Sequence, residues 1–326
     1  MNVITTQGLS KIYKRFEKEA GLKGSVKSLF NRKFTEKHAV SAFDLNIEKG
    51  EFVGLIGPNG AGKTTLVKML TGIIAPTSGE ISVLGYYPNK LENAFKKQYA
   101  VVMGQKSQLF FELTPTDTFR LFKELYAIPD DLYKRNVGYF VELFGVSQFL
   151  NVQVRTLSLG ERMKMELIVA LLHSPGVLFL DEPTIGLDAA SQRQMRLFLK
   201  EVNREKGTTI LLTSHYMEDV RSLCPRSIVI GGGAKIYDGS TDNLFDSYQT
   251  RKKITLAFDT ETDFTVPYNC ELIDKSPYKV VFMAPKDGDA RLISTLAQEY
   301  TPIDISAEEE DIGAVVERIY AGGMNR

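Results

Sequence analysis

The chain has 326 residues, and its 40 Lys and Arg residues balance its 40 Asp and Glu residues, so the formal net charge is zero. The length indicates two domains, the 43% hydrophobic content supports a sizeable core, and the neutral charge gives no argument for a nucleic-acid partner, so we expect none. Residues 1–6 lack the pattern of a signal peptide and no stretch approaches the roughly 18 apolar residues of a membrane helix, so we expect a soluble, cytoplasmic chain.

Residues 2–13 and 40–57 are predicted to be β segments, separated by a basic insertion over 14–37. Apolar residues within the insertion follow helical spacing while lysines share another face, which predicts a short basic amphipathic helix. Two interpretations stay open: a solvated excursion, or a helix that lies against anionic lipid or a membrane partner. The residues of the pattern are Leu22, Val26, Leu29 and Phe30, with Lys23 and Lys27.

The next segment fits G-x-x-x-x-G-K-[ST], a phosphate-binding loop that joins a strand to a helix. An apolar run precedes it and helix-compatible residues follow it. Its glycines let backbone N–H groups turn toward one anion, and the helix N-terminus adds its positive dipole end. Lys63 is expected to reach the β- and γ-phosphates of a nucleotide, and the Thr64 hydroxyl to bind Mg²⁺. The loop consists of Gly57, Pro58, Asn59, Gly60, Ala61, Gly62, Lys63, Thr64 and Thr65.

From about residue 106 to residue 172 the pattern is mostly helical, and Thr114 followed by Pro115 indicates a helix start. Unbroken apolar runs return at 177–180 and 208–212, and the residues between them include a helical pattern. Such runs are typical of strands buried on both faces of a parallel sheet. Alternating strands and helices predict an α/β fold with a helical insertion.

Two acids, Asp181 and Glu182, end the apolar strand predicted over 177–180. Carboxylates at the carboxyl end of a parallel strand lie in the crevice where α/β proteins bind their ligands. Asp181 is expected to hold Mg²⁺ through water, and Glu182 to orient and polarise an attacking water. Together with the phosphate loop, the two acids predict phosphoryl transfer from a nucleotide.

The run Leu-Ser-Leu-Gly-Glu at 157–161 precedes a helical stretch, and its Ser158 and Glu161 have the spacing of a helix capping box. Here the chain resembles the ATP-binding subunits of ABC transporters, whose signature is Leu-Ser-Gly-Gly-Gln or a near variant. The chain departs from that signature at Leu159 and Glu161. The resemblance implies that Ser158 and Gly160 contact the γ-phosphate of ATP held by the opposite subunit.

The same resemblance assigns roles to further residues. It implies that Gln105 touches the metal and couples the site to the helical subdomain. Asp188 belongs to a loop that crosses the dimer interface. His215 is expected to hydrogen-bond the γ-phosphate and to help hold Glu182 and the water. Tyr13 is expected to lie against adenine.

Over residues 2–240 the resemblance implies an α/β P-loop NTPase fold, an ABC cassette with a mixed β-sheet core and a helical subdomain over about 106–172. It also implies ATP and Mg²⁺ as ligands, a second copy that completes an ATP-sandwich dimer, and a separate integral membrane permease subunit. The chain is then expected at the cytoplasmic face of the cell membrane as a peripheral subunit.

We expect residues 1–239 to form the ATPase domain and residues 240–326 a small α+β accessory domain. In the second domain, strands are predicted near 253–258 and 279–283, and helices at about 289–299 and 310–320. The signature variant, the insertion and the tail look like those of ABC-2-type exporters, by analogy with the family. The alternative is a soluble ABC-type ATPase that acts on a non-transport partner.

Overall fold

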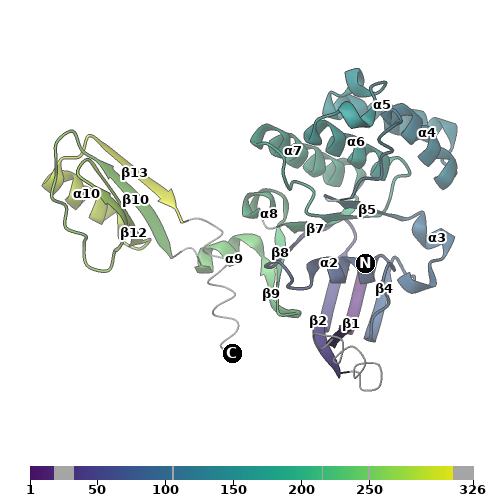
Figure 1. The fold of residues 1–326 in the computed structure, drawn as a ribbon, viewed down its shortest axis with the longest axis horizontal. Coiled ribbons are helices and arrows are strands. Elements are labelled where there is room, and N and C mark those ends of the chain that lie inside the picture. The colour runs from purple at the N-terminus through teal and green to yellow at the C-terminus, as the bar shows by residue number, and fades with distance from the viewer. Residues whose placement is uncertain (18–32, 105, 215, 249, 311–326) are drawn as a thin grey trace, which may run out of the picture. The chain divides into compact units, whose positions relative to one another are not determined.

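The computed structural model describes residues 1–17, 33–104, 106–214, 216–248 and 250–310. Its backbone contacts divide the chain into two compact units, Met1–Gly239 and Ser240–Arg326 (Figure 1). Two of the predicted site residues, Gln105 and His215, lie outside the described residues. The same holds for the amphipathic helix predicted around residues 22–30 and for all but the first residue of the helix predicted over 310–320.

In the described part of the first unit, the central sheet has six strands in the order β5 (Tyr99–Met103), β6 (Val177–Asp181), β7 (Thr209–Ser214), β3 (Phe52–Ile56), β8 (Arg226–Gly231) and β9 (Ala234–Ser240). The pairs β5–β6, β6–β7, β7–β3 and β3–β8 are parallel. β3, β6 and β7 are buried along their whole length, as their unbroken apolar runs predict. The α/β fold with parallel core strands is therefore confirmed.

A second, antiparallel sheet of the first unit has the order β2 (Lys33–Glu48), β1 (Asn2–Glu17) and β4 (Ser78–Val83) among the described residues. The β structure predicted over 40–57 is confirmed for 40–48 and 52–56, but it belongs to two strands, because β2 ends at Glu48 and β3 begins at Phe52 in the other sheet. Gly50 makes the turn between them with φ of +81°, a conformation that glycine adopts without strain.

Helix α2 (Lys63–Leu70) contacts β2 and β4 of the antiparallel sheet and β6 of the parallel sheet. It therefore lies between the two sheets, as Figure 1 also shows. Its side chains Leu66, Val67, Met69 and Leu70 are buried in the core that both sheets share. This burial fixes the start of α2 relative to the ends of the parallel strands.

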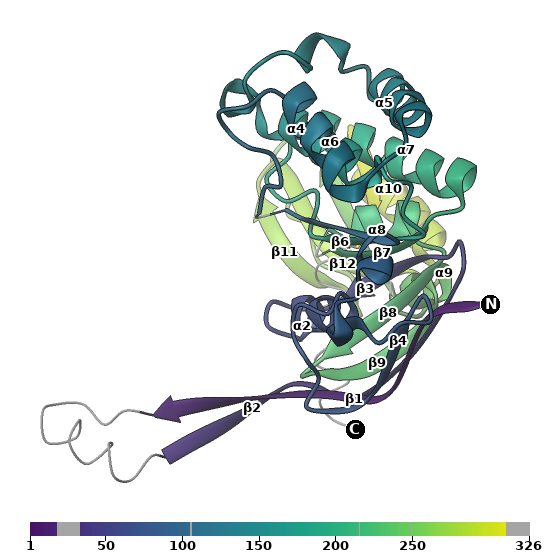
Figure 2. The same ribbon diagram turned by 90° about the vertical axis from the view of Figure 1, so that its right-hand side faces the viewer.

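Strands β1 and β2 extend past β4 as a two-stranded arm, which consists of residues 12–17 and 33–38 (Figure 2). β4 pairs with β1 only as far as Ser10, whereas β1 and β2 pair from Ile12 with His38 out to Glu17 with Lys33. The sequence predicts that the first strand ends at 13 and the next begins at 40, and both ends are wrong. The paired strands satisfy each other's backbone hydrogen bonds, so the strands continue into the basic segment that the sequence assigns to the insertion.

A helical layer covers one face of the parallel sheet in the first unit (Figure 1), and it consists of α4 (Pro115–Tyr126), α5 (Asp130–Phe144), α6 (Leu159–Leu171) and α7 (Ala189–Lys206). The predicted start of α4 is confirmed, because the Thr114 hydroxyl accepts a hydrogen bond from Asp117 N at 3.2 Å and Pro115 is the first helical residue. Shorter helices elsewhere in this unit are α3 (Asn93–Lys96) and α8 (Met217–Leu223).

The described part of the second unit contains helix α9 (Thr241–Tyr248) and a sheet in the order β11 (Glu271–Ser276), β12 (Lys279–Pro285), β10 (Arg251–Ala257) and β13 (Asp304–Glu309). Helix α10 (Asp289–Tyr300) contributes Leu296 to a core with Leu256, Phe264 and Phe282. No helix within the described ranges is long and apolar enough to cross a membrane.

Candidate active site

The phosphate loop joins β3 to α2, and Gly62 is its tightest point. Gly62 has φ of +115°, and a Cβ atom there would collide with the carbonyl oxygen of Ala39 in β2. Leu66 N donates the first helical hydrogen bond to Gly62 O at 2.8 Å, so α2 begins directly after the loop. A helix start that follows a glycine turn directs backbone N–H groups outward and binds anions.

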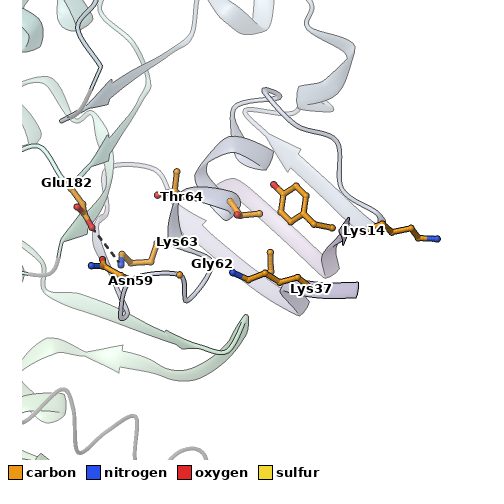
Figure 3. Close-up of a pocket in the computed structure, with 11 residues that line it drawn as sticks. Lys14, Lys37, Asn59, Gly62, Lys63, Thr64 and Glu182 are labelled. Atoms are coloured by element: carbon orange, nitrogen blue, oxygen red, sulfur yellow. Dashed lines mark ion pairs between the residues drawn. The ribbon is translucent and has the colours of Figure 1, made fainter. Parts of the chain in front are cut away.

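Lys63 lies at the centre of the site, with 5% of its side chain exposed. Its Nζ donates to Gly57 O at 2.6 Å and Pro58 O at 3.2 Å, and it lies 3.8 Å from Glu182 Oε1 (Figure 3). Burial lowers the pKa of the Lys63 ammonium, and the carboxylates of Glu182 and Asp181 oppose that shift. The strands and the loop therefore hold a cation beside the acid at the end of β6.

Asp181 accepts two hydroxyl hydrogen bonds at the end of β6. Thr213 Oγ1 donates to Asp181 Oδ1 at 2.6 Å, and Thr64 Oγ1 donates to the same oxygen at 3.3 Å. A carboxylate beside a hydroxyl is a donor set that suits Mg²⁺, which prefers oxygen ligands and keeps several waters. Sequence reasoning missed Thr213, because only the parallel pairing of β6 with β7 brings it beside Asp181.

Glu182 has a left-handed backbone with φ of +54°, which is uncommon for a residue other than glycine. Glu182 N donates to Thr213 O at 3.0 Å, which holds the turn after β6. Gly104 stands directly against the opposite side of this turn, where a Cβ atom would collide with Glu182 O. Strained backbone of this kind persists only where the surroundings enforce it, and such positions gather at active sites.

We expect the substitution Gly104→Ala to lower the free energy of unfolding by about 1–3 kcal/mol, the usual cost of overpacking, and to lower the ATPase rate by displacing Glu182. Gly138→Ala is the matched control, because a Cβ atom at Gly138 in α5 meets open space. The control is expected to gain about 0.5–1 kcal/mol, because alanine is the better helix former. Urea unfolding and ATPase rates test both, and equal behaviour of the two variants would contradict the role of Gly104.

A cavity of about 450 Å³ extends from the phosphate loop to the arm. Tyr13 lines it at the arm, while Lys63 and Glu182 line it at the strand ends. Sequence reasoning missed two lysines of the arm that also line it, since only the pairing of β1 with β2 brings them to the cavity. The lining residues are Tyr13, Lys14, Lys37, Ala39, Asn59, Gly60, Gly62, Lys63, Thr64, Thr65 and Glu182 (Figure 3).

Ser158, Gly160 and Asp188 form a second cluster, and they are not among the described residues that line this cavity. The predicted capping box at the start of α6 is confirmed: Ser158 N donates to Glu161 Oε2 at 2.8 Å, and Glu161 N donates to Ser158 Oγ at 3.3 Å. Gly160 stands against Ser191 at the start of α7, where a Cβ atom would collide with the Ser191 hydroxyl.

Asp188 caps α7 beside this contact. Its carboxylate accepts from Ser191 N at 2.9 Å and from Ser191 Oγ at 2.7 Å, and these hydrogen bonds lower its pKa. Two helix starts, those of α6 and α7, therefore lie side by side, each with its capping side chain at the exposed end. Such a pair of helix N-termini is a surface suited to an anion brought by another molecule.

Glu166 is a buried carboxylate of α6 that sequence reasoning also missed, with 3% of the residue exposed. It accepts hydrogen bonds from Ser107 Oγ, from Gln108 N at 3.0 Å and from Leu109 N at 3.3 Å. Burial raises the pKa of this carboxyl, and the hydrogen bonds oppose the shift. Glu166 thus joins the helix that begins at Ser158 to the segment that follows Gln105.

Comparison with known proteins gives consistent matches. The ABC transporter family matches residues 40–185. The ABC transporter ATP-binding protein NatA of Bacillus subtilis is 36% identical over 221 residues, 67% of this chain and 89% of that protein. The linearmycin resistance ATP-binding protein LnrL of Bacillus subtilis is 34% identical over 211 residues, 65% of this chain and 67% of that protein.

Among solved structures, a dimeric post-hydrolysis state of the ATP-binding cassette MJ0796 bound to ADP and Pi has a TM-score of 0.60 and 22% identity. The match covers 73% of this chain and 98% of that chain, and at this identity it establishes the fold. The fold, the site around Lys63 and the identity to NatA along most of its length agree. The chain belongs to the ABC transporter family, as one of its ATP-binding subunits that hydrolyse ATP.

Proposed function

We propose that this chain powers an ABC-2-type exporter, as a pair of identical ATPase subunits bound to a separate integral membrane permease at the cytoplasmic face of the cell membrane. The main support for the paired subunits is that Ser158, Gly160 and Asp188, the signature cluster, do not line the cavity of the phosphate loop on the same chain. Support for export comes from relatives such as LnrL, whose name denotes linearmycin resistance.

Within each subunit, the phosphate loop, residues 57–65, would hold the triphosphate and Tyr13 would lie against adenine. Thr64 and Asp181 have the oxygen donors to hold Mg²⁺, with Gln105 as the third proposed contact. A bound Mg²⁺ would neutralise charge on the phosphate oxygens. Glu182 would accept a proton from the attacking water, and His215 would hydrogen-bond the γ-phosphate and keep Glu182 oriented.

The second half of each site would come from the other copy. Ser158 and Gly160 at the start of α6, with Asp188 at the start of α7, would meet the γ-phosphate held at Lys63 of the partner subunit. ATP would then join the two surfaces, and hydrolysis would remove the shared ligand. Because ATP binds the closed pair more tightly than the open pair, its turnover can drive a change in a bound protein.

Exposed apolar side chains on segment 110–125 are the proposed permease contact. They are Phe110, Phe111, Leu113, Leu121 and Leu125, which are 37% to 64% exposed. Two sets of contacts link this region to α6: Glu166 of α6 accepts hydrogen bonds from Gln108 N and Leu109 N just before the segment, and Arg155 N, in the turn that precedes α6, donates to Phe111 O at 3.1 Å. A displacement of the segment by the permease would therefore reach the helix that begins at Ser158. The C-terminal unit would serve as an accessory domain.

We expect Phe110→Ser to reduce co-purification of the chain with its membrane subunit about five- to tenfold, because binding energy concentrates in a few central interface residues, each of which costs more than about 1 kcal/mol when truncated. Leu197→Ser is the control, since Leu197 on α7 is 62% exposed and lies outside this segment. The test is affinity purification from solubilised membranes, with the captured integral subunit identified by mass spectrometry. Recovery of a non-membrane partner alone would instead favour an ABC-type ATPase with a non-transport role.

A further inference from the structure

We propose that Lys37, on the arm, binds the α-phosphate of the nucleotide and so determines affinity for phosphorylated ligands. The proposal rests on the ATP site argued above. Tyr13 of β1 and Lys37 of β2 are directly paired in the antiparallel register. Side chains of directly opposed residues lie on the same face of a sheet, about 4.5–5.5 Å apart at Cβ. The arm therefore presents an aromatic ring and a cation side by side.

The strand that carries Lys37 is anchored to the phosphate loop. Ala39 lies two residues further along β2, at an irregularity where the pairing of β1 with β2 shifts between Lys11 and Ile12. Its carbonyl oxygen lies against Gly62, where a Cβ atom would collide with it. Both Lys37 and Ala39 line the cavity, and Figure 3 shows the Lys37 side chain directed from β2 toward Gly62.

The position of Lys37 along the cavity selects the part of the nucleotide that it meets. Tyr13 stands at the adenine end and Lys63 at the β- and γ-phosphate end. A nucleotide laid between them has its ribose and α-phosphate in the middle, where Lys37 lies. Of these two groups only the phosphate carries the negative charge that an ammonium group attracts.

Nothing in the described part of the chain competes for this lysine, because none of the described carboxylates forms an ion pair with Lys37. Lys14, the other arm lysine at the cavity, differs from Lys37 in its ion pairing and in the direction of its side chain. Its Nζ lies 3.7 Å from Glu36 Oε1, and Figure 3 shows its side chain directed away from the phosphate loop. The two lysines therefore make a matched pair, one aimed at the ligand and one not.

The test is binding of ATP, ADP and AMP to the full chain by calorimetry, with Mg²⁺ omitted so that ATP is not turned over. Lys37→Gln is expected to weaken all three nucleotides by a similar factor of about three to ten, because all three carry an α-phosphate and Lys37 is exposed. The affinity of the variant should also depend less on salt concentration, since one ion pair is lost. At saturating ATP its turnover with Mg²⁺ should be normal, with only KM raised.

Lys14→Gln is the matched comparison and should weaken the three nucleotides much less than Lys37→Gln, because the Lys14 side chain pairs with Glu36 and is directed away from the phosphate loop. If Lys37→Gln binds all three nucleotides normally, or loses affinity for ATP alone, then Lys37 does not contact the α-phosphate. Lys63→Ala, measured in parallel, separates this failure from a failure of the ATP site itself. If Lys63→Ala weakens ATP binding and Lys37→Gln does not, only the proposed role of Lys37 is wrong. If neither variant weakens ATP binding, the assignment of the ATP site itself is wrong.

Discussion

Replacing Glu182 by Gln is expected to leave ATP binding intact and to lower turnover by about 10²–10⁴-fold, the usual cost of removing a positioned general base. The amide keeps the size of the side chain but cannot take a proton from water. The left-handed backbone of Glu182 and the hydrogen bond from its N–H to Thr213 O do not depend on the carboxylate, so the turn should persist. Steady-state ATPase assays and ATP binding, measured on the same preparation, check the two halves of this expectation.

The same variant tests the proposed pairing of subunits. If ATP joins two copies and hydrolysis parts them, Glu182→Gln should accumulate as a dimer when ATP and Mg²⁺ are present, and light scattering would detect it. Glu124→Gln serves as the control, because Glu124 is exposed on α4 and far from the site in sequence. Near-normal turnover of Glu182→Gln would remove Glu182 from its role, and a variant that stays monomeric with bound ATP would contradict the shared site.

Sequence patterns predicted the features of this protein that depend on interactions between residues close together in the sequence. The phosphate loop is set by glycines that permit the positive φ of Gly62, and the buried strands by unbroken apolar runs. The helix starts at Thr114 and Ser158 follow from hydroxyl side chains that cap backbone N–H groups. Each of these features is encoded by neighbours in sequence, so a single chain without relatives is sufficient to find it.

The missed features depend on residues that are distant in sequence. Thr213 is a site residue because β7 lies beside β6, and Lys37 because β2 pairs with β1. Gly104 matters because β5 ends against the turn at Glu182. Most of the arm lies within residues 14–37, which the sequence predicts to be a basic insertion, because the two strands carry no apolar alternation from which β structure could be predicted. Strand order and register determine all four of these features, and the local sequence pattern specifies neither of them.

Replacing Lys63 by Ala is expected to raise the dissociation constant for ATP by about a hundredfold, because hydrogen bonds to charged groups are the strongest that a side chain contributes. Lys63 is the buried ammonium of the cavity, and its short contacts to Gly57 O and Pro58 O show that it reaches over the loop. The substitution also removes the cation 3.8 Å from Glu182, so an anionic ligand would face that carboxylate without a neighbouring positive charge.

Lys68→Ala separates the loss of this ammonium from a general effect on α2, because Lys68 lies in the last turn of the same helix and is only partly buried. Alanine is a good helix former, so both variants should fold, and thermal unfolding without nucleotide should be similar for the two. ATP should raise the melting temperature of Lys68→Ala as it does for the parent chain, and should leave that of Lys63→Ala unchanged. Tight ATP binding by Lys63→Ala would mean that the loop does not hold the triphosphate. Asp181 and Glu182 could then not have the proposed roles, because both roles require a triphosphate held at this loop.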